Sequence, residues 1–302
     1  MKPTPPSPSV AISIVNWNSY QDTKACLQSL KDIQYKNFEV FVIDNNSSDE
    51  SAQQLASEFS EYNFILNDKN TGFSGGHNVI IEQALHDEFD YILLLNNDTL
   101  VEPDFLSQLV VTGERDDNTG IVGGLILEYP ETSNVWYSGG KLSPIFGGSI
   151  SQEMEDDVVD VSLVTGCTML IKSKVFDDIG LLRERLFMYF EDNEFCRRAT
   201  TNGWDLKVNR RSRIYHKCGG STDEGSVASP LKAYYMTRNW ILLLKSSPTA
   251  VERTIGLLYM LSSRVIIFSY WLIFGGRDVA YAGLLGVKDG ILNKSGKHPN
   301  YP

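Results

Sequence analysis

Short apolar runs alternate with helix-like patterns between residues 10 and 127 of the chain. The runs at 10–15 (VAISIV), 38–43 (FEVFVI) and 91–95 (YILLL) are typical of buried strands, and two more strands are expected at 64–66 and 121–127. Between these runs, apolar residues recur at roughly helical spacing. Such alternation indicates βαβ units, so we expect an α/β protein with a mostly parallel sheet.

Helices are expected between the strands, over residues 22–30, 49–59, 76–86 and 103–113. The cluster Ser47-Ser48-Asp49 supplies cap-forming side chains for the second helix, and Pro103 suits the first turn of the fourth. The acidic run 153–160 is interpreted as a solvated loop.

The two ends of the chain depart from the α/β pattern. Residues 1–8 contain four prolines and no apolar stretch of the kind that a signal peptide needs. We expect them to form a disordered leader and the protein to stay in the cytoplasm. The main domain is assigned to residues 9–245, which end in a helix over 229–244, and a helical C-terminal segment to 246–302.

Composition and charge narrow the classes of function. The four cysteines form no C-x-x-C pair and no zinc-ligand spacing, which indicates packing in a reducing compartment. The net charge is -11, with 13 basic and 32 acidic side chains up to residue 204, and 14 basic and 6 acidic ones beyond it. The acidic main domain argues against a nucleic-acid partner. The basic C-terminal third permits an anionic partner such as a membrane surface.

The C-terminal run 255–274 is close to membrane-spanning length but has Arg264 at its middle. A charge there costs about 2.5–3.5 kcal/mol on insertion scales, so a simple span is disfavoured. With Trp271 and Tyr270, and with Arg253 and Arg277 at its flanks, the run suits a helix lying in a membrane interface. Packing against the main domain or a second subunit gives the same composition and stays open.

Polar clusters follow each of the first four predicted strands. They are Asn16-Trp17-Asn18, the segment 44–49, the segment 67–76 and Asn96-Asn97-Asp98. Each alone is consistent with a loop or a helix cap. Because the carboxyl ends of parallel strands form one edge, where such sheets bind ligands, we expect a polar crevice shaped for a nucleotide. In it, Asp44 could accept a hydrogen bond from a base or a ribose hydroxyl.

Three glycines, Gly72, Gly75 and Gly76, follow the third strand without forming G-x-G-x-x-G, and the chain has no G-x-x-x-x-G-K-[ST]. A dehydrogenase or an ATPase of those classes is therefore not supported. We expect the glycines to let the backbone approach a ligand before the next helix begins.

The stretch LLLNNDT ends a buried strand in two amides and the carboxylate Asp98. Mg²⁺ and Mn²⁺ favour one or two carboxylates, with substrate phosphates completing the shell, so Asp98 is a candidate metal ligand. The alternative is a helix cap, which Pro103 disfavours because it places the next helix too far along.

The stretch FMYFEDNEFCRR places Glu191 and Asp192 after three aromatic residues and at the start of a helix. The pair could simply complement the helix dipole. Alternatively, desolvation by the aromatics would raise the pKa of a carboxylate toward the range useful for a general base. His216 alone would be interpreted as structural. The glycines and hydroxyls that follow it suggest a loop that folds over phosphates.

The chain resembles the family 2 inverting glycosyltransferases, and within them most of all the rhamnosyltransferase branch. The resemblance covers residues 10–245 and rests on IVNWN, VIDNNSSD, NTGFSGGHN, LLLNNDT, TGCTMLI, MYFEDNEFCRR, HKCGGST and YYMTRNW, in that order. It implies the GT-A fold, a Rossmann-like α/β arrangement with helices on both faces of the sheet.

The resemblance also implies the roles of individual residues. Asp192 would be the catalytic base beside Glu191, and Asp98 and His216 would bind Mg²⁺ or Mn²⁺ at the donor diphosphate. Asn96 stands where the family's Asp-x-Asp motif has its first carboxylate, which predicts weaker metal binding or a changed ribose contact. The donor site would comprise Asn16, Asp44, Asn46, Gly72, Phe73, Gly76, Asn78, Asn96 and Asn97.

The predicted function is transfer of a sugar from a nucleotide-diphosphate donor to a saccharide or lipid-linked acceptor in cell-surface polysaccharide synthesis. Branch resemblance favours dTDP-rhamnose, with a UDP-hexose or UDP-galactofuranose as the alternative donor. An inactive sugar-nucleotide-binding module is the alternative of another class. The enzyme is expected at the cytoplasmic face of the membrane, with a homo-oligomer left open.

Overall fold

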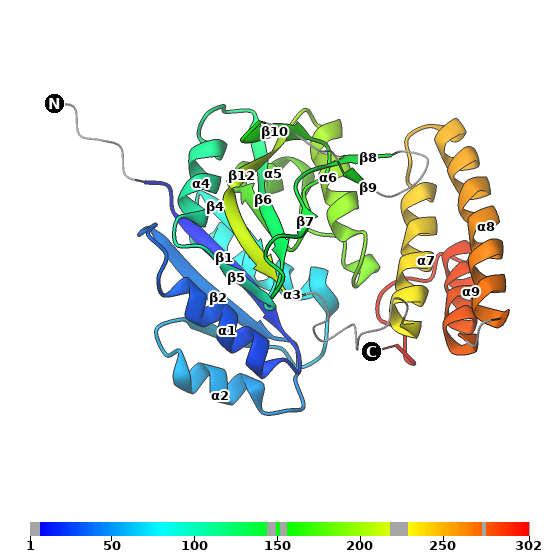
Figure 1. Ribbon diagram of the computed structural model, residues 1–302, viewed down its shortest axis with the longest axis horizontal. Coiled ribbons are helices and arrows are strands. Elements are labelled where there is room, and N and C mark those ends of the chain that lie inside the picture. The colour runs from blue at the N-terminus through cyan, green and yellow to red at the C-terminus, as the bar shows by residue number, and fades with distance from the viewer. Residues whose placement is uncertain (1–6, 144–148, 152–155, 218–228, 274–275, 302) are drawn as a thin grey trace.

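The computed structural model describes residues 7–143, 149–151, 156–217, 229–273 and 276–301. A sheet of ten strands forms the centre, with its main path in the order β10-β12-β6-β11-β4-β1-β2-β3. Figure 1 shows this sheet between two sets of helices, with the last three helices gathered at one side. The predicted α/β class is confirmed.

The first half of the sheet is parallel, as the sequence predicts. It comprises β1 (Val10–Asn16), β2 (Phe38–Asp44), β3 (Asn63–Leu66) and β4 (Tyr91–Leu95). β1 pairs with β2 on one side and with β4 on the other. The four strands therefore end at the same edge, which brings the polar clusters that follow them together.

Antiparallel pairs enter the second half. β11 (Thr168–Lys172) runs antiparallel to both β4 and β6 (Thr119–Glu128), and β6 is parallel to the long β12 (Asp205–His216). The short β5 (Thr99–Val101) pairs with the end of β12, and β7 (Val135–Tyr137) with β6. A separate small sheet joins β8 (Gly140–Leu142) to β9 (Ser149–Ser151).

The acidic run was predicted to be a solvated loop, and this is wrong for its last residues. Val158–Val161 form β10, antiparallel to β12. Val159 and Val161 are buried, while Asp160 points outward to Lys207. The alternation of buried valines with an exposed acid fits an edge strand. Residues 153–155 lie outside the described part of the chain.

Helices cover both faces of the sheet, as expected. α1 (Tyr20–Leu30), α2 (Ser51–Glu58) and α4 (Phe105–Gly113) contribute to one hydrophobic core. α3 (Gly72–His86), α5 (Ser173–Ile179) and α6 (Glu191–Thr201) contribute to the other, and the 3-10 turn η1 (Glu184–Leu186) precedes α6. Alternate residues of β4 point into the two cores, so this strand is buried on both faces.

Four helix starts differ from prediction by two residues or more, and α1 is one of them because it begins at Tyr20 instead of residue 22. α2 begins at residue 51 because Glu50 takes a left-handed conformation (φ 58°), and Ser47 bonds Asp44 instead of capping the helix. α3 begins at Gly72, four residues early, so Gly75 and Gly76 lie inside the helix. α4 begins two residues after Pro103, whose carbonyl accepts a hydrogen bond from Gln34.

The C-terminal part forms α7 (Pro230–Lys245), α8 (Ala250–Ile273) and α9 (Arg277–Ile291). Small residues let α9 approach α7 closely: a Cβ added at Gly286 would lie 2.6 Å from the Tyr234 carbonyl oxygen. α8 lies on the outer side of this group (Figure 1). Within the described chain it is the one helix long and apolar enough to cross a membrane.

The predicted leader falls mostly outside the described residues, which begin at Ser7. The carbonyl of Ser7 accepts a hydrogen bond from Asn37 (2.6 Å), and that of Pro8 accepts one from Tyr35 (2.5 Å). The end of the expected leader therefore contacts the α/β core.

Candidate active site

A chain of side-chain hydrogen bonds links the polar clusters after β1, β2 and β4. Asn97 donates to Thr23 (2.8 Å), and Thr23 donates to the Asn16 amide oxygen (2.8 Å). The Asn16 amide in turn donates to Asp44 (2.7 Å) and to Ser51 (2.8 Å). Asn16 is fully buried, and its side-chain hydrogen bonds go to protein groups. It therefore holds the Asp44 carboxylate in place.

Asp44 lies at the end of β2 and is 4 % exposed. Its Oδ1 accepts from Asn16 and Ser47, and its Oδ2 accepts from the Ser47 backbone N–H (2.8 Å). A carboxylate has about four acceptor positions, so Oδ2 retains capacity for a ligand. The neighbouring Asn46 is exposed and has a left-handed backbone (φ 62°).

The start of α3 packs tightly on the loop before α6. Gly72 has φ 73°, and a Cβ there would lie 2.3 Å from the Phe187 carbonyl oxygen, which accepts a hydrogen bond from Phe73 N–H (2.8 Å). A Cβ at Gly76 would lie 2.9 Å from Val15. The predicted role of these glycines in approaching a ligand is untested, and the structure shows that they permit close packing of the chain on itself.

Asn78 was predicted to line the donor pocket. Its amide nitrogen donates to the Leu182 carbonyl and to Glu184, each at 3.0 Å, and its amide oxygen accepts from Leu182 N–H (3.1 Å). These three bonds hold the segment leading into η1 against α3.

Asp98 and His216 lie together because β5 pairs with the end of β12, with Thr99 opposite His216. His216 Nε2 is 3.2 Å from Asp98 Oδ1, and both side chains are largely buried, 12 % and 17 % exposed. The Asp98 carbonyl accepts a hydrogen bond from Lys217 N–H (2.9 Å). Asp98 does not cap α4, because β5 lies between them.

The donor set at this point fits a divalent cation. Asp98 Oδ1 is buried and makes no hydrogen bond within the described residues besides its 3.2 Å ion-pair contact with His216 Nε2, so it keeps acceptor capacity. One carboxylate oxygen and one imidazole nitrogen suit Mn²⁺, and Mg²⁺ also favours the carboxylate. In the part of the chain that is described, no group of three or more His, Cys, Asp or Glu side chains is placed to hold a metal ion. A substrate diphosphate would therefore have to complete the shell.

The segment 165–167 connects Asp192, the predicted base, to the residues Asn96-Asn97-Asp98 that follow β4. Gly166 N–H donates to Asp192 Oδ2 (3.2 Å), and the next residue, Cys167, accepts from Asn96 N–H (3.0 Å). A Cβ added at Gly166 would lie 2.9 Å from the Phe73 ring. Asp192, Asn96 and Phe73 come from three separate motifs, and all of them lie against the segment 165–167.

The carboxyls of Glu191 and Asp192 both have raised pKa values. Burial is the main cause for each, and the neighbouring Asp192 carboxylate adds to the effect on Glu191, whose pKa rises to about 8. Backbone N–H groups and the Thr165 hydroxyl bond Asp192 and partly oppose the rise. Glu191 Oε2 is buried without a hydrogen-bond partner in the described chain. A carboxylate with a raised pKa is a stronger base.

The loop before this pair has an unusual backbone. Phe187, Tyr189 and Phe190 have φ values of 66°, 65° and 70°. Each such non-glycine conformation costs of order 1–3 kcal/mol and persists only where the surroundings enforce it. Strain of this kind clusters at functional sites, and here it directly precedes the acidic pair.

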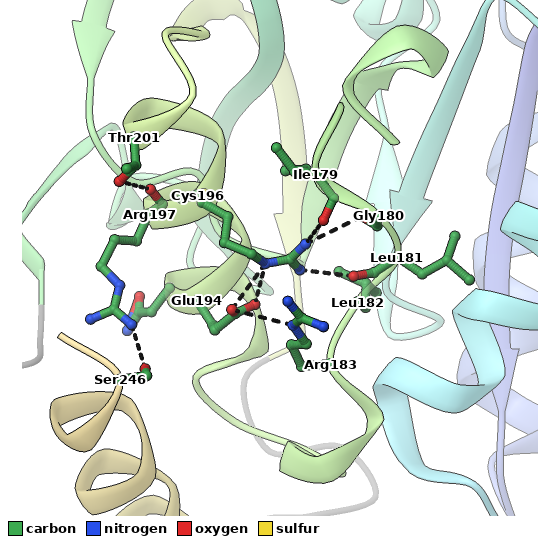
Figure 2. Close-up of polar contacts among 12 residues, drawn as sticks. Ile179, Gly180, Leu181, Leu182, Arg183, Glu194, Cys196, Arg197, Thr201 and Ser246 are labelled. Atoms are coloured by element: carbon green, nitrogen blue, oxygen red, sulfur yellow. Dashed lines mark hydrogen bonds and ion pairs between the residues drawn. The ribbon is translucent and has the colours of Figure 1, made fainter. Parts of the chain in front are cut away.

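The adjacent residues Arg197 and Arg198 anchor α6 to different parts of the chain, and Figure 2 shows the Arg197 side chain directed to Ser246. Arg198 pairs with Glu194 (2.9 Å) and donates to the carbonyls of residues 179–181. Arg197 points the other way and donates to Ser246 (2.6 Å) and Ser247 (3.2 Å), between α7 and α8. The helix that begins with the acidic pair is thus fixed to both the sheet domain and the C-terminal helices.

Comparison with known proteins identifies the family. The model of glycosyl transferase family 2 matches residues 11–180. The chain belongs to this family. The matched residues include β1 from its second residue onward and the whole of β2, β3 and β4. They also include Asn96-Asn97-Asp98 and the segment 165–167. This family 2 chain is therefore a glycosyltransferase that uses a nucleotide sugar.

Relatives of this family 2 chain extend over almost its whole length. It is 26 % identical over 303 residues to the low-salt glycan biosynthesis hexosyltransferase Agl10 of Haloferax volcanii, covering 95 % of this chain and 92 % of the relative. It is 23 % identical to the dTDP-rhamnosyl transferase RfbF of Shigella flexneri, covering 85 % and 84 %. Identity at this level does not fix the sugar.

Solved structures support the fold. The mannosyltransferase PcManGT of Pyrobaculum calidifontis, in complex with GDP-Man and Mn²⁺, superimposes with a TM-score of 0.60 at 12 % identity, over 98 % of this chain and 83 % of that one. The predicted GT-A fold is confirmed.

Several residues of the site were not singled out from the sequence. Thr23 and Ser51 complete the network around Asn16, and Gly166 joins the motifs. Thr23 and Ser51 lie in ordinary helix sequence and give no signal. Gly166 lies in TGCTMLI, a matched motif to which no chemistry was assigned. Gly219, Gly220, Ser221 and Thr222, predicted to fold over phosphates, lie outside the described residues.

Proposed function

We propose that this family 2 glycosyltransferase moves a sugar from a nucleotide-diphosphate donor to an acceptor hydroxyl with inversion at the anomeric carbon. The observation that carries the proposal is the contact between the buried Asp98 Oδ1 and His216 Nε2 beyond the carboxyl end of a central strand, where this oxygen makes no further hydrogen bond within the described residues. Gly166 and Cys167 connect that edge to Asp192.

In the proposed reaction Asp192 accepts the proton of the acceptor hydroxyl while the acceptor oxygen bonds to the anomeric carbon. The bond from that carbon to the diphosphate oxygen breaks, and its electron pair leaves with the nucleoside diphosphate. A single displacement of this kind inverts the configuration. Glu191 lies next to the base, and the Asp192 charge adds to burial in raising the pKa of Glu191.

Asp98 and His216 are the residues proposed to hold Mg²⁺ or Mn²⁺ at the donor diphosphate. When bound, the ion would neutralise charge on the leaving diphosphate. The proposed donor-site residues fall into two groups. The first group supports the site through contacts within the protein and comprises Asn16, Gly72, Gly76 and Asn78. The second group holds the candidates for touching the donor, which are Asp44, Asn46, Phe73, Asn96 and Asn97.

For the donor we propose dTDP-rhamnose, with a UDP-hexose or UDP-galactofuranose as the alternative. The relative named as a dTDP-rhamnosyl transferase supports the first, and the one named as a hexosyltransferase supports the alternative. An inactive binding module is disfavoured because the Asp98–His216 contact and the acidic pair are both in place.

The experiment is a screen of nucleotide sugars, with the full chain and Mn²⁺ or Mg²⁺, for nucleoside diphosphate release. The proposal predicts release from one donor well above the rest, with dTDP-rhamnose first. Binding of a donor without release, in the presence of saccharide and lipid-linked acceptors, would support the inactive module.

We further propose that α8 lies on the cytoplasmic face of a membrane and brings the enzyme to a lipid-linked acceptor. Its outward side chains are apolar and exposed, including Val265 (66 %), Ile266 (72 %) and Ile273 (73 %). The sole charge between residues 254 and 273, Arg264, turns inward over the Trp240 ring (5.1 Å). Arg264 therefore penalises a membrane span but not contact through the outer face.

A further inference from the structure

The loop 186–190 has a backbone that its own sequence does not favour. Phe187 combines φ 66° with ψ -60°, and Met188 N–H donates to the Leu186 carbonyl at 2.8 Å. This is a γ-turn with positive φ, a rare and strained conformation. Tyr189 and Phe190 follow in left-handed conformations, and Glu191 comes next. None of these positions is a glycine, so contacts from outside the loop must hold it.

Those contacts come from the neighbouring residues Arg238 and Asn239 of α7. The Asn239 amide nitrogen donates to the carbonyls of Leu186 (2.7 Å), Met188 (2.7 Å) and Tyr189 (2.9 Å). One side chain thus binds three carbonyl groups of the same strained loop. The side chain is fully buried, and each of these bonds goes to that loop.

Arg238 fixes Asn239 in this orientation. Its Nε donates to the Asn239 amide oxygen (2.9 Å), so the amide nitrogen must face the loop. Arg238 Nη2 donates to Leu186 (2.9 Å), and Nη1 donates to Gly296 beyond α9 (2.6 Å). The loop is therefore held from α7 and from the C-terminal tail at once.

The same loop also contacts the proposed donor side of the site. The Phe187 carbonyl accepts from Phe73 N–H at the start of α3 (2.8 Å). Gly72 packs against Phe187, where a Cβ would lie 2.3 Å from its carbonyl oxygen. A change in the loop would move the acidic pair relative to α3.

We propose that Asn239, oriented by Arg238, is a positioning residue that locks the loop 186–190 in the conformation that presents Asp192 to the acceptor. The inference rests on the proposed role of Asp192 as the base. The asparagine touches no reacting atom and acts through the loop alone. A displacement of about 1 Å at a reacting group can cost about 100-fold in rate.

Asn239→Ala tests the proposal, with Lys245→Ala as the matched control. Lys245 lies on the same helix and donates to Gly290, Ile291 and Asn293, so its removal costs a comparable set of bonds without touching the loop. We expect Asn239→Ala to lower kcat about 10- to 100-fold with the donor KM changed less than about threefold. Lys245→Ala should keep kcat within about threefold of wild type.

The pH profile separates positioning from a loss of folded protein. The titratable groups that interact with Asp192 are Glu191 and Cys196 on α6 and Tyr137 on β7. If the loop relaxes, water reaches the acidic pair and its pKa falls. The acid-side midpoint of kcat/KM should therefore move to lower pH in Asn239→Ala. A purely structural role would lower the profile at every pH and leave its midpoint unchanged.

Asn239→Ser, which keeps one short donor, carries the same test if the alanine variant does not fold. It should lower kcat less than alanine and shift the midpoint in the same direction. An unchanged midpoint, or equal losses in the Asn239 and Lys245 variants, would overturn the proposal. Absence of any transfer by the wild type would instead contradict the proposed function.

Discussion

His216 Nε2 lies 3.2 Å from Asp98 Oδ1, although the two residues are far apart in the sequence. The contact exists because β5, which follows Asp98 directly, is the strand that pairs with the last residues of β12. The metal site proposed from family resemblance is thus consistent with a geometric arrangement built into the sheet.

Asp98→Asn and His216→Ala should each weaken activation by Mn²⁺. Each change removes one of two proposed protein ligands, so we expect the Mn²⁺ concentration for half-maximal transfer to rise at least about tenfold. The measurement is a Mn²⁺ titration of transfer after EDTA treatment. Asp22→Asn, which alters the nearby pair of Asp22 with Lys217, is the control and should leave the titration near that of wild type. Full turnover of the EDTA-treated wild type would contradict the metal assignment.

Glu191→Gln should leave the acid limb of kcat/KM in place. The base works only when ionised, and burial raises the pKa of Asp192, so activity falls as pH drops through a value above the ordinary range. Glu191 has a pKa of about 8 and is therefore neutral on the acid limb, so glutamine removes no charge there. A pH profile of both proteins checks this, and a limb that moves by more than about half a pH unit would show that Glu191 is charged while Asp192 titrates.

The same substitution has a sign-specific effect on stability. The pKa of Glu191 is raised from 4.5 to about 8 in the folded chain, so wild type loses stability as pH rises across that interval. Glu191→Gln, which cannot ionise, should therefore gain stability relative to wild type between pH 4.5 and pH 8. Urea unfolding at both pH values would show it.

Gly72→Ala should destabilise the protein and lower transfer. The added Cβ meets the Phe187 carbonyl oxygen at 2.3 Å, in addition to the cost of φ 73°. We expect a loss of about 2–4 kcal/mol in the free energy of unfolding. Gly203→Ala is the matched control, because Gly203 has φ 89° and no neighbour within 4 Å of the added Cβ. Equal losses in the two variants would mean that the contact with Phe187 carries no cost.

Charged substitutions on the outer face of α8 should abolish membrane binding. Val265→Glu and Ile266→Glu place carboxylates on that face, so flotation with anionic phospholipid vesicles should drop at least about tenfold. Val111→Glu, at an equally exposed position on α4, should float like wild type. Absence of flotation by the wild type, together with a dimer that the α8 variants disrupt, would assign the face to a second subunit.

The sequence predicted β1 to β4 and β6, and the buried runs on β1, β2 and β4 were clear because they are continuous and apolar. It made no prediction for β11 or β12. It failed at β10, where the exposed acids between Val159 and Val161 hid an edge strand. It also placed the start of α3 too late. Glycine has low helix propensity, but here Gly76 is helical because α3 packs within reach of Val15.

The sequence predicted the edge of the sheet at which the site lies, but it predicted fewer of the contacts between the side chains there. Sequence alone placed polar clusters at the strand ends. It could not show that Asn97 reaches Asn16 through Thr23, because that chain depends on which strands are neighbours. The positive-φ backbone of Phe187, Tyr189 and Phe190 also gives no sequence signal, since aromatic residues rarely adopt it.

The central claim is tested most directly by Asp192→Asn, measured for both donor binding and sugar transfer. The substitution keeps the shape of the side chain and removes its ability to take a proton. The account predicts donor binding within about threefold of wild type and transfer reduced about 10²- to 10⁴-fold. Near-normal transfer with unchanged donor binding would contradict the assignment of Asp192 as the base.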